Sequence, residues 1–517
     1  MYLFAASTSG SPLHPVDVAV VAVYLLAMLA VGVWVGRGQR TTKDYFLGDR
    51  SLPWWAVLLS IVATETSTVT FLSIPGGAYA AGGDLRFLQI TFGYIVGRAL
   101  VVLVLLPLYF RGEPFTAYEV LQRRFGKFSR RATSALFLVT RNLSDALRLY
   151  LSALVLQAAM GLDLASSIVI MGVVTLVYTY IGGVRSVVWN DCVQFAIYIL
   201  GACLALQQII ASLPGGWEGF RQFGQEHHKF RLLDFDFTML KPTMTFWAGL
   251  IGGAFLTGAT HGTDQLTVQR LLTARSQTSA AVALIASGAV VCLQFALFLI
   301  IGIGLAAFFA SHPAGAAEIE SNDQAFAYYI VHYLRPGVVG LTLAAVFSAA
   351  MSTLSGSLNS SATALVKDFI IPLRRRPLSE TAEFRISKIA TGLFGVIQIG
   401  IALASHLRNA DRSIVESVLT IAAFTSGPML GLYLLAVLTP RVRERAALAA
   451  FAAGLLLLAY MEFSTWPRWP IETLRWPLAA PIYWPWYAAI GSVFTLLVGC
   501  LLSFTPLNGS RMEADAT

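Results

Sequence analysis

The chain has 517 residues, of which 56% are hydrophobic and 12% are charged, and its formal net charge is +8 at pH 7. Soluble proteins carry about 25% charged residues, so this composition excludes an ordinary soluble domain. Repeated apolar runs of about 20 residues predict a polytopic membrane protein instead.

Hydropathy and turn signals predict about 13 membrane-spanning helices and an all-α fold. A leading helix is followed by about ten helices and then by two trailing helices. The expected spans are 16–36, 54–78, 86–108, 132–160, 164–181, 187–212, 244–270, 279–310, 327–366, 386–405, 413–437, 446–463 and 483–503. The four cysteines lie within these spans and have neither disulfide-framework nor zinc-site spacing.

Basic residues are concentrated on one side of the expected membrane. With the N-terminus outside, the cytoplasmic loops and tail hold 23 lysines and arginines, and the opposite loops hold 10. This bias follows the positive-inside rule, so the basic charge indicates topology and not nucleic-acid binding. The sequence therefore predicts a multi-pass protein of the cell membrane, with a cytoplasmic C-terminus, the lipid bilayer around it and no nucleic-acid partner.

The first unusual span contains Ser60–Gly76, which carries a carboxylate (Glu65), a run of hydroxyls and a terminal Pro-Gly pair. Backbone polar groups at membrane depth must be paired, and irregular backbone persists there only where it lines a protein cavity. We interpret this span as a broken helix whose carbonyls and hydroxyls bind a small cation and a solute. The alternative is a kinked structural helix with Glu65 near its outer end.

A Gly-Gly pair at 182–183 predicts a turn at the inner face, and Asp191 follows in the next apolar helix. An acidic side chain inside a span must be paired, be neutralised or face a cation. We interpret Asp191 as part of an inner exit path for a cation. The alternative is a salt bridge with Arg185.

A second interruption, Gly258–Asp264, lies five helices after the first. An odd number of helices between two breaks places them in opposite orientation, and paired interruptions of this kind are typical of inverted-repeat transporters. Asp264 can cap the freed backbone. Arg270 and Arg275 are expected to anchor the end of this span among the lipid headgroups.

A serine-rich stretch, Phe347–Thr363, follows in a later span. Ser348, Ser352, Ser355 and Asn359 recur at a spacing that places them on one helical face. Sodium is a hard cation that prefers oxygen ligands, which hydroxyls and peptide carbonyls supply. The alternative is that small residues on this face let two helices pack closely.

Four motifs in chain order resemble the sodium:solute symporter family. They are Ala-Thr-Glu-Thr-Ser at 63–67, Gly-Gly-Val-Arg-Ser-Val-Val-Trp-Asn-Asp at 182–191, Asp-Gln-Leu-Thr-Val-Gln-Arg at 264–270 and Ser-Thr-Leu-Ser-Gly-Ser-Leu-Asn-Ser at 352–360. The resemblance, which runs from about Lys43 to about Pro440, implies a LeuT-like core of two inverted five-helix repeats. The implied parts are a leading helix and inner loop (1–45), the first repeat (46–212), an extracellular loop (213–243), the second repeat (244–440), and two trailing helices with a short cytoplasmic tail (441–517).

The resemblance also implies a sodium site. Its ligands would be the carbonyls of Ala63, Thr66 and Ala349 and the side chains of Ser352 and Thr353. Asp191 and Ser355 correspond to a second sodium site or exit path in some members. Gly356 stands where that second site would want a hydroxyl, which argues for a single sodium ion.

The same alignment suggests which residues face the solute. They are Thr70, Gln89, Ser144, Arg148, Thr257, Thr260 and His261. A guanidinium is a good partner for a carboxylate, so Arg148 favours a carboxylated solute. Alternatively, Arg141 and Arg148 pair with Asp145 or Glu65, and His261 is a hydrogen-bonded structural residue.

These observations predict a sodium-coupled symporter that imports a small polar organic solute, with a carboxylated solute as one option. The alternatives are a sugar or polyol symporter and a sodium-independent facilitator or channel. The sequence contains no nucleophile–base pair, zinc-binding helix or nucleotide loop of the kind that would indicate an enzyme. We expect a monomer or a weak oligomer.

Overall fold

The structure is a computed structural model that describes residues 13–112, 114–240, 243–319, 321–407, 412–464 and 482–508. Within these residues every named element is a helix, and the only β-type pairing is an isolated bridge between Leu52 and Ala274. The predicted all-α class is therefore confirmed. The predicted cytoplasmic tail lies outside the described residues from position 509 onward.

Most of the helices are joined by short connections, and short 3-10 and π segments extend several of them. In chain order they are α1 (Pro15–Gly36), α2 (Thr42–Leu47), α3 (Trp54–Glu65), α4 (Thr68–Tyr79), α5 (Ile90–Leu100), α6 (Leu106–Phe110), α7 (Tyr118–Arg124), α8 (Lys127–Met160), α9 (Leu164–Ala211), α10 (Gly216–Glu226), α11 (Gly253–Gly262), α12 (Gln265–Leu272), α13 (Gln277–Ala310), α14 (Pro313–Ala317), α15 (Gln324–Tyr333), α16 (Val338–Ala364), α17 (Ile371–Leu373), α18 (Glu380–Leu407), α19 (Arg412–Leu438), α20 (Glu444–Phe463) and α21 (Trp486–Leu502).

Seven spans among the described residues are long and apolar enough to cross a membrane, and an eighth is formed if α3 and α4 count as one broken span. The axes of these two helices differ by 61° across their break. The prediction of an interrupted helix in this part of the chain is therefore confirmed.

One predicted span is divided differently from the prediction. The span expected at 327–366 consists of α15 and α16, which are separated at Leu334–Gly337. Pro336 cannot supply a backbone N–H, and Gly337 has φ +87°, so the helix stops there. The spans expected at 164–181 and 187–212 are the two helices of α9, which meet at a kink at Gly183 (φ 50°, ψ −152°), so the turn predicted at the Gly-Gly pair is confirmed.

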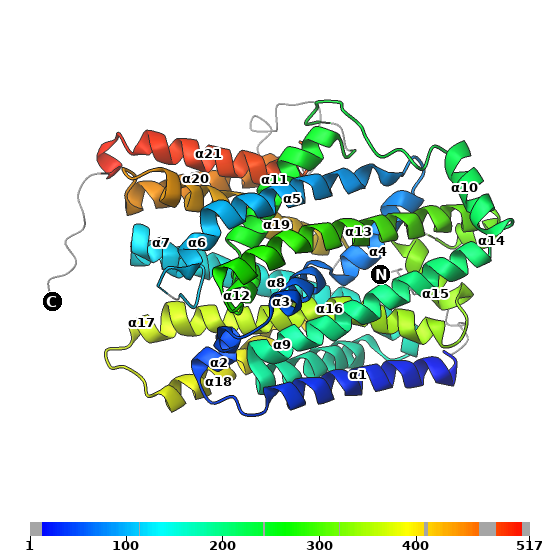
Figure 1. Cartoon of the computed structure of the whole chain (residues 1–517), viewed down its shortest axis with the longest axis horizontal. Coiled ribbons are helices and arrows are strands. Elements are labelled where there is room, and N and C mark those ends of the chain that lie inside the picture. Colours follow the sequence, from blue (N-terminus) through cyan, green and yellow to red (C-terminus); the bar gives the residue numbers. More distant parts are fainter. Residues whose placement is uncertain are drawn as a thin grey trace.

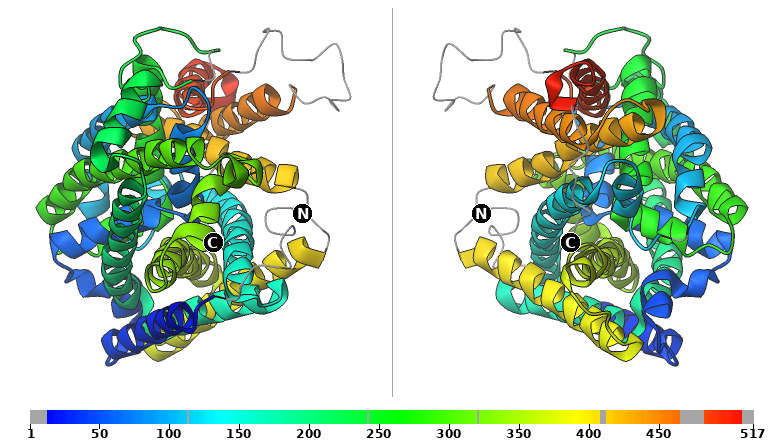
Figure 2. Two further views of the ribbon diagram at one scale, coloured as in Figure 1. Left: turned by 90° about the vertical axis from the view of Figure 1, so that its right-hand side faces the viewer. Right: turned by 90° about the vertical axis from the view of Figure 1, so that its left-hand side faces the viewer.

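The most buried helix is α16. Together with the turns that extend it, α16 runs to Leu373, and 89% of the most apolar stretch of this span is buried. The corresponding share for α1 is 22%. The end-on views show α1 at one edge of the bundle and α20 with α21 at the opposite edge (Figures 1 and 2). The serine-rich segment of α16 therefore lies inside the protein, where its hydroxyls must find partners.

Candidate functional site

The first broken helix leaves backbone groups unpaired next to α16. The last backbone hydrogen bond of α3 runs from the Thr66 amide to the Val62 carbonyl. The carbonyls from Ala63 onward therefore have no partner within the helix. One of them is taken up by α16, since the Thr353 hydroxyl donates to the Thr64 carbonyl at 3.0 Å.

The break contacts α16 at a second point, where the Thr68 hydroxyl lies 3.4 Å from the Val346 carbonyl. Within α16, the Thr353 hydroxyl also lies 3.4 Å from the Ala349 carbonyl. Three of the five predicted sodium ligands, Ala349, Ser352 and Thr353, are thus on the face of α16 that meets the free carbonyls of α3. This arrangement supplies neutral oxygen atoms, the ligand type that a hard cation prefers.

Asp191 lies next to this region and is fully buried. Its carboxylate accepts hydrogen bonds from Ser352 Oγ at 2.6 Å and from Ser60 Oγ at 2.5 Å. Arg270 Nη2 lies 3.2 Å from the same carboxylate, and Arg270 Nε donates to Ser60 Oγ at 2.9 Å. This cluster joins α3, α9, α12 and α16, so it connects both broken helices.

Two expectations for these charges are wrong. Arg270 is not among the headgroups, because its side chain is 3% exposed and faces Asp191. Asp191 does not pair with Arg185, which donates to the Ser51 hydroxyl instead. The physical reason is that a buried carboxylate needs an equally buried counter-charge. Arg275, in contrast, is exposed as expected.

Ser355, the other residue predicted at a second sodium site, bonds within its own helix. Its hydroxyl donates to the Ser352 carbonyl at 3.1 Å. Farther along the same face, Asn359 accepts from Gln269 of α12 at 2.7 Å. A side-chain hydrogen bond therefore joins this part of α16 to α12.

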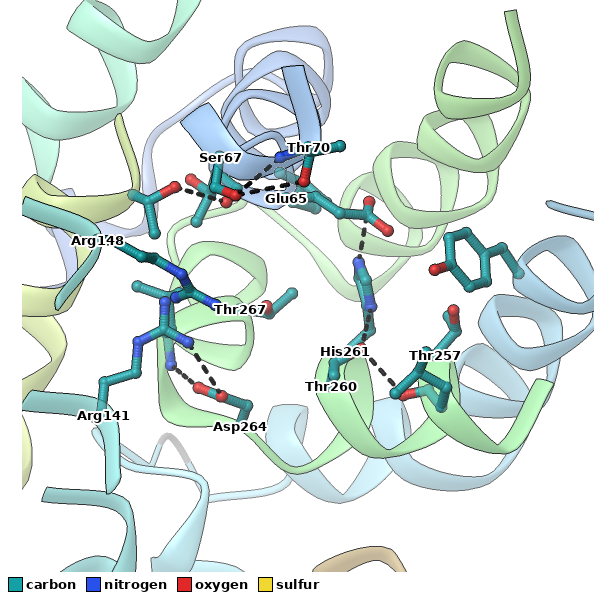
Figure 3. A pocket seen from close by; sticks show the side chains of 16 residues that line it. Glu65, Ser67, Thr70, Arg141, Arg148, Thr257, Thr260, His261, Asp264 and Thr267 are labelled. Atoms are coloured by element: carbon teal, nitrogen blue, oxygen red, sulfur yellow. Dashed lines mark hydrogen bonds and ion pairs between the residues drawn. The ribbon is translucent and has the colours of Figure 1, made fainter. Parts of the chain in front are cut away.

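A cavity of about 220 Å³ lies beside the first break. The residues that line it come mainly from α3, α4, α8, α11 and α12 (Figure 3). Its polar lining consists of Thr64, Glu65, Ser67, Thr70, Tyr94, Arg141, Arg148, Thr257, Thr260, His261, Asp264, Thr267 and Thr353. Five of the seven predicted solute residues are thus brought together: Thr70, Arg148, Thr257, Thr260 and His261.

The other two predicted solute residues lie outside the lining of this cavity. Gln89 is fully buried and uses its amide to hold the Arg86 and Met244 carbonyls and the Asp234 amide. Ser144 donates to the Thr140 carbonyl of its own helix at 2.8 Å. Both side chains form hydrogen bonds with backbone groups. The sequence pattern could not distinguish this role from contact with a solute.

One wall of the cavity carries two arginines that share a carboxylate. Arg141 Nε and Arg148 Nη1 lie 2.7 Å and 2.6 Å from the two oxygens of Asp145. Arg141 also lies 3.6 Å from Asp264, which caps α12 by accepting from the Leu266 amide. The alternative that both arginines pair with Asp145 is confirmed, and pairing of either with Glu65 is wrong.

The guanidinium of Arg148 has hydrogen-bond donors that the ion pair with Asp145 does not use. Within the described part of the chain its hydrogen bonds involve Nη1 alone, and its side chain is 27% exposed into the cavity. Nε and Nη2 can therefore bind an anion without breaking the ion pair with Asp145.

Behind the opposite wall, in contact with its residues Glu65 and His261, lies a residue that the sequence did not point to, Arg98 of α5. It is fully buried, and its Nη2 lies 2.5 Å from Glu65 Oε2 and 3.3 Å from His261 Nε2. An arginine in the middle of an apolar span requires a carboxylate partner, and this signal could have identified the pair. Glu65 is therefore paired inside the bundle.

His261 is held between these charges and a hydroxyl. Its Nδ1 lies 3.0 Å from Thr260 Oγ1, whose own hydrogen is donated to the Leu256 carbonyl. Its Nε2 lies 3.3 Å from Arg98 Nη2 and 3.6 Å from Glu65 Oε2. His261 is thus hydrogen-bonded and also lines the cavity.

The donor set suits a hard monovalent cation better than a transition metal. No group of three histidine, cysteine, aspartate or glutamate residues that could hold a metal ion occurs in the described part of the chain. The oxygens gathered between α3 and α16 are hydroxyls and carbonyls, next to a carboxylate that already has a partner.

Comparisons with known proteins agree with this picture. The family model described as "Sodium:solute symporter family" matches residues 45–454. The chain is 31% identical to the human sodium/iodide cotransporter over 453 residues, which is 85% of this chain and 68% of the relative. It is 32% identical to mouse sodium-coupled monocarboxylate transporter 1 (89% and 76% covered) and 28% identical to the sodium/sialic acid symporter NanT of Aliivibrio fischeri (95% and 93% covered). These relatives are transporters and not enzymes.

Solved structures show the same relationship. A Na+-coupled sialic acid symporter, in a substrate-bound outward-open state, matches with a TM-score of 0.84 and 26% identity, over 95% of this chain and 97% of that one. Mhp1, a nucleobase-cation-symport-1 family transporter, matches with a TM-score of 0.55 and 15% identity, over 91% of this chain and 97% of that one. The second similarity concerns the fold alone.

Proposed function

The chain belongs to the sodium:solute symporter family, and from this premise we propose that it imports a small carboxylated solute together with sodium by alternating access. The observation that carries the proposal is the position of one cavity next to both halves of a broken helix. That cavity contains a guanidinium with free donors, and the helix presents unpaired carbonyls to the hydroxyls of α16. A cation can therefore bind on the side of the broken helix that faces α16, and an anion on the side that faces the cavity.

We propose that sodium binds between the break of the first helix and α16. Its ligands are the carbonyls of Ala63, Thr66 and Ala349 and the hydroxyl oxygens of Ser352 and Thr353. The hydroxyl hydrogens of Ser352 and Thr353 already point at Asp191 and at the Thr64 carbonyl. The oxygen lone pairs of both side chains are therefore available to a cation.

The solute binds in the cavity with its carboxylate on Arg148. Thr257, Thr260 and His261, on the opposite wall, contact its other end (Figure 3). Thr70, in the first turn of α4, lines the cavity next to Ser67, the residue that caps that helix. A sugar or polyol would leave Arg148 without an anionic partner, so we favour a carboxylate.

Coupling follows from the sharing of the broken helix. A sodium ion that orders the carbonyls around Thr66 also orders Ser67 and Thr70, which are part of the cavity. Sodium and solute then favour the same closed conformation, which is the condition for thermodynamic coupling.

The finer architecture belongs to the same proposal. Two inverted repeats, 46–212 and 244–440, place the break of α3 and α4 opposite the break of α11 and α12. The second break falls at Thr263–Asp264, at the end of the stretch that the sequence singled out. We place the N-terminus outside and the C-terminus in the cytoplasm.

The test is a solute screen on the purified protein, followed by uptake in proteoliposomes. Thermal stabilisation is measured with sugars, amino acids, monocarboxylates and vitamins, each in sodium and in choline buffer. We expect a carboxylate to stabilise the protein only in sodium and to be accumulated along an inward sodium gradient. Equal uptake in choline would support a facilitator, and stabilisation by sugars alone would refute the carboxylate assignment.

A further inference from the structure

We propose that the loop between α17 and α18, together with the first turns of α18, binds the headgroup of an anionic phospholipid. The groups that bind it are four arginines, called the loop arginines below: Arg374, Arg375, Arg376 and Arg385. The loop lies at the same end of the bundle as α7 and the end of α21 (Figure 1). In the topology proposed above, this end meets the cytoplasmic leaflet of the membrane.

The guanidiniums of the loop arginines are free. All four side chains are exposed, and within the described residues they make no ion pair and no side-chain hydrogen bond. Glu380 and Glu383 are the acidic residues between positions 374 and 388, and Glu383 is already paired with Lys367. The loop arginines therefore carry a surplus of positive charge that the described part of the chain does not neutralise.

Other arginines at this end of the bundle are used by the protein itself. Arg123 and Arg124 donate to backbone carbonyls, and Arg130 pairs with Asp368 at 2.6 Å. These side chains fix the inner loops to the helices around them. The loop arginines have no such task, so their charges are available to an anion from outside the protein.

An exposed apolar stripe on α18 places Arg385 at the level of the lipid headgroups. Ile389, Leu393 and Val396 are 59%, 48% and 65% exposed, and they follow Arg385 at intervals of four, four and three residues. These intervals place all four residues on one face of the helix. An exposed apolar face of a membrane span contacts acyl chains. Arg385 therefore lies one turn beyond the acyl chains, where arginine side chains extend to the phosphates.

Leu373 brings the run of three arginines to the same depth. It directly precedes Arg374, and its side chain is 63% exposed. Exposed apolar side chains next to cationic ones are typical of segments at the boundary between acyl chains and headgroups. A guanidinium binds a phosphate through two parallel N–H donors. A phospholipid satisfies both the arginines and the apolar side chains, whereas a soluble anion would satisfy the arginines alone.

The experiment measures lipid binding to the purified full-length protein in detergent by native mass spectrometry. Phosphatidylglycerol is compared with phosphatidylcholine that has the same acyl chains. A basic residue near an anionic lipid contributes roughly fivefold in affinity. We therefore expect the unmodified protein to prefer phosphatidylglycerol by at least about tenfold. The triple variant of the run should lose this preference: Arg374→Gln, Arg375→Gln, Arg376→Gln.

A second triple variant is the matched control. It removes the same charge from three exposed arginines around the start of α20, and it should keep the preference: Arg441→Gln, Arg443→Gln, Arg445→Gln. The same loss in both triple variants would show a general effect of charge and would overturn the inference. Equal affinity of the unmodified protein for the two lipids would also overturn it.

Two further measurements keep the result unambiguous. Glycerol 3-phosphate, a soluble headgroup without acyl chains, should displace phosphatidylglycerol poorly, and full displacement would show a site for free phosphate instead. The thermal midpoint shows whether each variant is folded. If the triple variant of the run does not fold, Arg385→Gln decides, because it should weaken phosphatidylglycerol binding about fivefold while the loop stays intact. An unchanged affinity in a folded Arg385→Gln variant would contradict the assignment.

Discussion

Replacing Arg148 with glutamine tests how the cavity recognises its solute. The substitution removes the guanidinium that has free donors in the cavity. Asp145 retains Arg141 at 2.7 Å on its other oxygen, so no buried carboxylate is left without a counter-charge. The protein should therefore fold, and the change should be confined to solute binding.

The expected size follows from the bond that is lost. A hydrogen bond to a charged group contributes about 1.5–3 kcal/mol. Loss of the carboxylate–Arg148 contact should therefore weaken solute binding by roughly 10- to 150-fold. Because the proposed sodium site lies elsewhere, the affinity for sodium in the absence of solute should stay within about twofold of the unmodified protein.

The assay compares a carboxylate found in the solute screen with its uncharged amide. The unmodified protein should prefer the carboxylate, and Arg148→Gln should bind both equally weakly. Arg148→Lys, which keeps the charge but lacks the planar pair of donors, should be intermediate. A folded Arg148→Gln variant that still binds the carboxylate within twofold of the unmodified protein would refute the reasoning.

Three further predictions concern stability and energetics. Arg98→Met leaves Glu65 without its ion-pair partner and should lower the free energy of unfolding by about 3 kcal/mol, seen as a lower thermal midpoint. The double variant Arg98→Met, Glu65→Gln should recover most of the lost stability. A midpoint that stays as low in the double variant would contradict the pairing. Lys229→Met removes the ammonium that caps α4 at the carbonyls of Ala78 (3.0 Å) and Ala80 (2.7 Å). This substitution should lower the free energy of unfolding by about 1–3 kcal/mol in the same assay. An unchanged thermal midpoint would show that the cap is not needed. If one sodium ion travels with one monocarboxylate, an inside-negative potassium diffusion potential should leave the uptake rate in proteoliposomes unchanged, and faster uptake would show that net positive charge moves inward.

The parts of the fold that the sequence could predict rest on local signals. The first break was foreseen because Glu65, a run of hydroxyls and a Pro-Gly pair are incompatible with a continuous lipid-facing helix. The oxygen-rich face of α16 was foreseen from the helical spacing of its serines. Motif matching then identified most of the polar lining of the cavity, including Arg148 and His261.

What the sequence could not supply is the pairing of charges across long separations. Arg270 was expected at the headgroups because an arginine near the end of a span usually extends to the interface, and its partner Asp191 is 79 positions away. Arg98 and Glu65 are 33 positions apart and on different helices. The position of Gln89 outside the lining of the cavity could not be predicted, because a polar side chain facing a cavity and one binding free carbonyls have the same sequence pattern.

The most direct test of the account is the effect of sodium on solute affinity in the unmodified protein and in the double variant Ser352→Ala, Thr353→Ala. Isothermal titration of the carboxylate found in the screen, in sodium and in choline buffer, measures this coupling. We expect sodium to raise the affinity of the unmodified protein at least about tenfold, within the usual range of coupling energies. In the double variant, provided that it remains folded, sodium should have no effect. Equal sodium enhancement in both proteins would show that the ion does not bind between α3 and α16.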